Sequence, residues 1–124
     1  MAQGYFEQAL APQQESLALY RELGDRRGQA ESLNEVGVVY QWQGRYEEAL
    51  ARQRESLAIR RELGDPRGEA ETLRALGVTL RALGRPAEAR AHWREAVAIF
   101  EQLQTRDGVQ VRLLLTDLPA NLPR

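Results

Sequence analysis

The sequence predicts an all-α fold, a solenoid of antiparallel helix pairs with about six helices. One observation is an internal repeat, since residues 21–31 read RELGDRRGQAE and residues 61–71, 40 positions later, read RELGDPRGEAE. A second is its extent, because residues 15–54 align with residues 55–94 without a gap and about 22 of the 40 positions are identical. A third is that apolar residues recur at helical spacing between glycines. Such a period is typical of stacked units that cannot bury their apolar faces alone.

The repeated phrase predicts the end of one helix, a tight turn and the start of the next. Gly24 and Gly64 follow apolar-periodic stretches and suit the left-handed position after a helix. Asp25 and Asp65 can then cap the next helix through their carboxylates. Pro66 falls at a first helical position, where its missing N–H costs nothing. We therefore expect the chain to turn the same corner twice.

A second corner recurs at residues 43–49 and 83–89. Gly44 and Gly84 end a helix there, and Pro86 is tolerated near the start of the next. With both corners placed, helices are expected at residues 4–23, 26–43, 46–63, 66–83, 86–104 and 106–118.

Each helix carries one stripe of apolar and small residues. In the first helix of each pair the stripe includes Gly37 or Gly77, which costs about 1 kcal/mol against alanine. We expect these glycines to let the paired helix come close, with Ala49 and Ala89 as their counterparts. The remaining stripe residues are Leu33, Val36, Tyr40, Tyr46, Leu50 and Leu57 in the first copy and Leu73, Leu76, Leu80, Trp93 and Val97 in the second.

The first helix of each pair is termed first-type, and the second helix second-type. One domain, residues 1–118, is expected to contain an unpaired second-type helix at 4–23, repeat 1 at 26–63, repeat 2 at 66–104 and a degenerate first-type helix at 106–118, before a tail at 119–124. In the last helix Thr105 could serve as a cap and Leu113 stands at the place of Leu33 and Leu73. Asp117 replaces the glycine of the other copies, which makes this helix weak.

The motif L-x-x-V-G-x-x-Y at residues 33–40, followed by G-x-Y at 44–46 and by Ala49, resembles the tetratricopeptide repeat. Leucine replaces the usual first tryptophan in both copies, and Gln53 replaces the expected aromatic residue in the first. The period of 40 residues resembles the variant in LGN/Pins-like scaffolds and in the repeat arrays of bacterial regulators. The second copy carries L-x-x-L-G-x-x-L at 73–80, then Gly84, Ala89 and Trp93.

The resemblance implies a right-handed superhelix whose first-type helices line a concave groove. Val38 and Val78 stand where two known modes of peptide binding, the carboxylate clamp and the asparagine ladder, need asparagine, and the chain has no Lys, so we reject both modes. By position, the groove candidates are Glu31, Asn34, Val38, Gln41 and Trp42 in the first copy and Glu71, Arg74, Val78 and Arg81 in the second.

Within this set, Arg74 and Arg81 lie seven positions apart on one helix face and could hold a carboxylate bidentately. The alternative is a solvated charged face that pairs with Glu71. Trp42 could anchor a ligand or pack against the neighbouring repeat.

The composition points away from several classes of function. The net charge of −1 gives no footprint for nucleic acid or for a membrane surface. The chain has no Cys, no apolar run as long as a membrane span and no signal peptide, so we expect a cytoplasmic protein. His92 is a lone histidine without neighbours at metal-ligand spacing. We therefore expect no metal, no cofactor and no enzymatic activity.

The two terminal helices each lack a pair partner in the sequence. Apolar faces left uncovered at both ends would mark an interface, either with missing repeats of a longer array or with other copies of the chain. The residues expected in this end interface are Phe6, Leu10 and Leu17 at one end and Val111, Leu114, Leu115 and Leu118 at the other.

The function that these observations favour is a protein–protein interaction module. It would bind a peptide or a helix of a partner protein in the groove, as part of a larger scaffold or regulator. One alternative is a structural segment that self-associates through its end helices. Another is a peptide-sensing domain of a signalling regulator.

Overall fold

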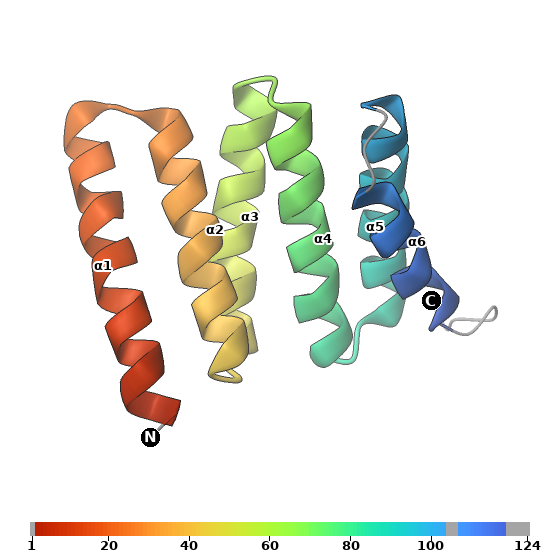
Figure 1. The fold of residues 1–124 in the computed structure, drawn as a ribbon, viewed down its shortest axis with the longest axis horizontal. Coiled ribbons are helices and arrows are strands. Elements are labelled where there is room, and N and C mark those ends of the chain that lie inside the picture. The colour runs from red at the N-terminus through yellow and green to blue at the C-terminus, as the bar shows by residue number, and fades with distance from the viewer. Residues whose placement is uncertain (1, 104–106, 119–124) are drawn as a thin grey trace. The chain divides into compact units, whose positions relative to one another are not determined.

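The computed structural model describes residues 2–103 and 107–118, and the regular secondary structure within them is entirely α-helical (Figure 1). This confirms the predicted all-α helical repeat, and the helix bounds agree with the expected ones to about two residues. Positions 104–106 and the tail at 119–124, including the predicted cap Thr105, lie outside the described residues. The helices are α1 (Ala2–Leu23), α2 (Arg26–Trp42), α3 (Tyr46–Glu62), α4 (Pro66–Ala82), α5 (Pro86–Gln102) and α6 (Asp107–Thr116).

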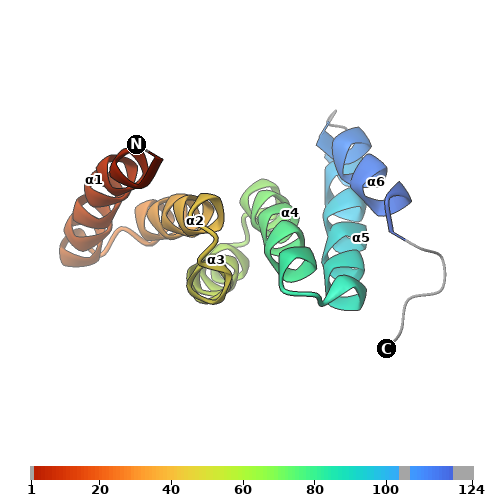
Figure 2. The same cartoon turned by 90° about the horizontal axis from the view of Figure 1, so that it is seen from below.

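The helices form two compact units, Met1–Gly64 and Asp65–Arg124. In the first unit α2 packs against both α1 and α3, and in the second α5 packs against both α4 and α6 (Figures 1 and 2). Each unit therefore contains one complete pair of a first-type and a second-type helix, α2–α3 or α4–α5, and one additional helix.

The corners form as predicted, through glycines in the left-handed region. Gly24, Gly44, Gly64 and Gly84 have φ angles of 69°, 77°, 62° and 74°, which a residue without a Cβ adopts at little cost. At the first corner the N–H of Asp25 donates to the carbonyl of Tyr20 at 2.9 Å, the bond of a Schellman motif. The carbonyl of Tyr20, in the last turn of α1, is thereby paired by the backbone of the corner.

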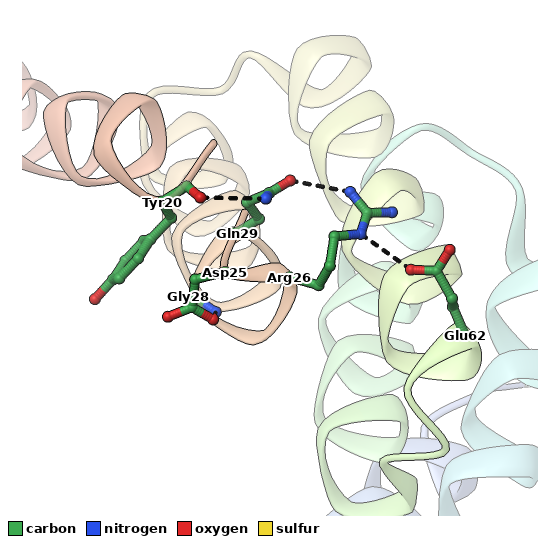
Figure 3. Close-up of polar contacts among 6 residues, drawn as sticks. All are labelled: Tyr20, Asp25, Arg26, Gly28, Gln29 and Glu62. Carbon is green, nitrogen blue, oxygen red and sulfur yellow. Dashed lines mark hydrogen bonds and ion pairs between the residues drawn. The ribbon is translucent and has the colours of Figure 1, made fainter. Parts of the chain in front are cut away.

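The capping aspartates also stand as predicted. Asp25 Oδ1 accepts from the N–H of Gly28 at 2.9 Å, at the residues labelled in Figure 3. Asp65 Oδ1 accepts from the N–H of Gly68 at 3.1 Å, and Pro66 begins α4. Each carboxylate pairs a backbone donor of the first turn that has no partner inside the helix.

We expect Asp65→Ala to lower the free energy of unfolding of the α4–α5 unit by about 1 kcal/mol, because it removes this cap. Thermal unfolding followed by circular dichroism measures the effect. Asp65→Asn is the control, since asparagine caps helices as well as aspartate does, and it should stay close to the wild type. Equal losses in both variants would contradict the capping role.

The helix pairs meet at the mid-helix glycines, and the side chains nearest to these glycines are not those of the expected alanines, although the backbone carbonyl of Ala49 would lie 3.3 Å from a Cβ on Gly37. A Cβ placed on Gly77 would lie 2.0 Å from Trp93 Nε1, and one placed on Gly37 would lie 2.6 Å from Gln53 Cγ. The side chains that occupy the space are thus four residues beyond Ala49 and Ala89. A side chain that fills the gap gains more packing than two small residues facing each other.

Trp93 is completely buried, and its Nε1 donates to the backbone carbonyl of Arg74 at 3.0 Å. The indole therefore fills the space over Gly77 and satisfies its one polar atom at the same time. The second copy has the expected aromatic residue here, whereas the first copy uses the equally buried Gln53.

Candidate functional site

The predicted groove residues of α2 lie away from its buried stripe. That stripe contains Leu33, Val36 and Gly37, which pack inside the unit. Among the groove candidates, Glu31 and Trp42 are exposed, whereas Asn34, Val38 and Gln41 are half-buried. The helix thus presents a mixed polar and apolar face.

Trp42 lies at the carboxyl end of α2 beside the first turns of α1. Its side chain is 57% exposed, and its ring centroid lies 6.4 Å from that of Phe6. Phe6 in turn makes an edge-on contact with Tyr5, at 5.8 Å between centroids, and Tyr5 is also exposed. We call Tyr5, Phe6 and Trp42 the aromatic cluster. Sequence reasoning missed Tyr5, although its position next to Phe6 was a usable signal.

On α4 the predicted charged residues have different partners from those expected. Glu71 pairs with Arg67 at 3.5 Å, and not with Arg74. The guanidinium of Arg81 lies 5.4 Å from the centre of the Trp93 ring, a cation–π contact. Within residues 2–103 and 107–118 the guanidinium of Arg74 has neither an ion pair nor a hydrogen bond. Val78, one turn further on, is half-buried.

Other charged side chains form pairs with near neighbours at the start of, or within, the second-type helices α3 and α5. Arg85 holds Glu88 with two bonds of 2.9 Å, and Arg45 holds Glu48 in the same way. The side-chain hydrogen bond from Arg45 lowers the pKa of the Glu48 carboxyl. His92 Nδ1 lies 3.6 Å from Glu95 across one helical turn. These are exposed or partly exposed pairs of helix neighbours, which contribute little to stability individually.

A network of polar side chains connects the three helices of the first unit at the first corner (Figure 3). Arg26 donates to Glu62 of α3 and to Gln29 of α2, both at 3.0 Å. Gln29 donates to the carbonyl of Tyr20 at the end of α1, at 3.4 Å. We call this set the corner network. The second copy cannot build it, because the equivalent residues are Pro66, Glu69 and Gln102.

The expected end interface needs correction at both ends. Leu17 and Val111 are buried inside their own units, so the prediction that they are exposed is wrong. Leu17 faces α2 in a cluster with Leu33. In α6 Val111 is buried, whereas Leu113 is exposed. The other predicted residues, Phe6, Leu10, Leu114, Leu115 and Leu118, are half-buried.

The large apolar residues that are exposed on the end helices are different ones. Besides Tyr5 of the aromatic cluster, they are Leu19 and Leu23 on α1 and Val109 and Leu113 on α6. Sequence reasoning chose the stripe that each end helix turns toward its neighbour and so missed the opposite side. The 40-residue offset could have found it, because Leu19 stands at the position of Ile59.

Two further findings concern chemistry and membranes. Among the described residues, no group of three His, Asp or Glu side chains is arranged to hold a metal ion. No helix in the same part of the chain is both long and apolar enough to cross a membrane.

Comparison with known proteins identifies the repeat. A search of curated proteins finds no significant match. A family model described as tetratricopeptide repeat matches residues 28–102, which include nearly all of α2 and all of α3, α4 and α5. The match covers more than half of the 124 residues, and it includes the glycine corners at Gly44, Gly64 and Gly84 and the close contacts of both helix pairs. The chain therefore belongs to the tetratricopeptide repeat family.

Proposed function

We propose that the chain is a protein–protein interaction module that binds a peptide or a helix of a partner protein through the outward faces of α2 and α4. Tetratricopeptide repeats generally mediate protein–protein interactions. In this proposal the module is part of a larger scaffold or regulator, and each first-type helix contributes its own contacts.

The observation that carries the proposal is the exposure of Trp42. Nothing in the fold requires a large ring at this position, since the second copy has the small exposed Ala82 there. Exposed tryptophans that a partner can bury are typical anchors of interfaces. Here the neighbouring Phe6 and Tyr5 would widen the apolar surface that such a partner covers.

Arg74 and Val78 supply the corresponding contacts on α4. A guanidinium without an internal partner can hold a carboxylate in a bidentate manner. Arg81 already lies over the ring of Trp93, so we assign the charged contact to Arg74 alone. A ligand with an acidic group and an apolar side chain about one helical turn apart would match this pair.

Selection from a displayed library of random peptides tests the proposal. We expect the peptides selected on the wild-type chain to combine acidic and large apolar residues. Trp42→Ala should weaken the binding of peptides that bind at α2, and Arg74→Glu that of peptides that bind at α4, each by about tenfold or more, which corresponds to ~1.4 kcal/mol. Isothermal calorimetry or fluorescence anisotropy with a synthetic selected peptide gives the affinities.

Matched controls separate this surface from general effects. Arg94→Glu makes the same charge change at an exposed site on α5, and Leu103→Ala removes a partly exposed apolar side chain at the end of that helix. Both should bind selected peptides as the wild type does. The proposal fails if no peptide is enriched, or if these controls lose as much affinity as the Trp42 and Arg74 variants.

A further inference from the structure

We infer that a second copy of this chain covers the end helices, with α6 of one copy docking on α1 of the next as α2 docks on α3. The residues that carry it are not among those assigned to peptide binding, so the inference does not depend on the proposed peptide binding. It starts from residues at equivalent positions that differ in burial.

The first such residue is Leu19 in α1, which stands at the position of Ile59 in α3. Ile59 is only 6% exposed and belongs to a core cluster with Leu33 of α2. Leu19 is 58% exposed, although it is just as apolar. Thus the exposed side of α1 is the side that α3 turns toward α2.

The complementary exposure is found on α6. Leu113 is 61% exposed, whereas Leu33, at the equivalent position of α2, is 1% exposed. At its start α6 meets α5 as α2 meets α1, since Gly108 lies against Phe100 where Gly28 lies against Tyr20. Among the described residues α6 packs against α5, which precedes it, but no second-type helix follows it to complete its pair. The helix α1 is of this second type.

A hydrogen bond of the complete pair also has its equivalents at the ends. Ser56 Oγ of α3 donates to the carbonyl of Ala30 in α2 at 2.8 Å. The matching donor in α1 is Ser16, and the matching carbonyl belongs to Gln110 in α6. One register therefore brings together an apolar pair and a hydrogen bond.

Such a contact is heterologous, because each copy contributes a different surface to it. Repetition leads to closed rings or to open chains. A two-fold contact of α1 with α1, or of α6 with α6, would instead use one surface twice. This difference allows a test by mixing variants.

Light scattering coupled to size-exclusion chromatography is the experiment. The mass of the wild-type chain should rise with concentration, whereas Leu19→Asp and Leu113→Asp should each remain monomeric. An equimolar mixture of the two variants should give a heterodimer and nothing larger. Its one intact junction joins α6 of the Leu19→Asp chain to α1 of the Leu113→Asp chain.

A further variant guards against effects on folding. Ala18→Asp places the same charge next to Leu19, at a position whose equivalent, Ala58, stays exposed in the complete pair, and it should assemble as the wild type does. Circular dichroism confirms that each variant is as helical as the wild type.

The inference is overturned by a wild-type mass that does not change with concentration. It is also overturned if the mixture of the two leucine variants stays monomeric, or if one of them alone assembles fully, as a two-fold contact would allow.

Discussion

Replacement of Trp93 by alanine should lower the free energy of unfolding of the α4–α5 unit by about 3–5 kcal/mol, the range for removal of a large buried aromatic side chain. The ring is completely buried over Gly77, and its Nε1 pairs the carbonyl of Arg74. Alanine would leave a cavity and remove that hydrogen bond. Urea unfolding followed by far-ultraviolet circular dichroism measures the loss.

Trp42→Ala is the matched control, since it deletes the same atoms from a site that is more than half exposed. We expect it to cost less than about 1 kcal/mol, as surface substitutions usually do. If the two variants lost the same free energy, the indole of Trp93 would not be the packing centre of its unit.

Gly77→Ala is expected to destabilise the same unit by about 1–3 kcal/mol through overpacking. Alanine is the better helix former by about 1 kcal/mol, so the sign depends on the contact. A Cβ would lie 2.0 Å from Trp93 Nε1, so the indole or the helix would have to move. Urea unfolding again gives the difference in stability.

The same substitution in a chain without the indole tests whether the ring causes the loss of stability. In a chain that already carries Trp93→Ala, the obstacle to the new Cβ is gone, and Gly77→Ala should become neutral or stabilising by up to about 1 kcal/mol. Gly37→Ala should cost less than Gly77→Ala, because the nearest atoms belong to the flexible side chain of Gln53. The same loss in both backgrounds would show that the ring is not responsible.

The sequence was sufficient for the helices because their ends depend on local residues. Gly24 supplies a left-handed conformation and Asp25 a cap within a few positions of each other, so the corner can be recognised without knowledge of the packing. The partner of Gly77 could not be read in this way. It depends on how far the indole of Trp93 reaches across the pair, which spacing alone does not give.

The candidate sites were predictable only in part, for a related reason. The outward positions of α2 follow from its helical period once the buried stripe is known. The contact of Arg81 with Trp93 depends on side-chain rotamers, and the burial of Leu17 and Val111 depends on which neighbour an end helix has. Terminal helices have a neighbour on one side only, so positions transferred from the complete pairs assign them the wrong exposed face.

The self-contained corners have a consequence for how such a gene can change. The backbone bond and the cap that form the turn at Gly24 join residues 20–28, and the turn at Gly64 has the same glycine and the same capping aspartate. A 40-residue cassette bounded by these turns would carry the glycine and the capping aspartate that form a turn at its borders. Unequal recombination could then lengthen or shorten the array by whole cassettes, and an engineer could do likewise without redesigning a single junction.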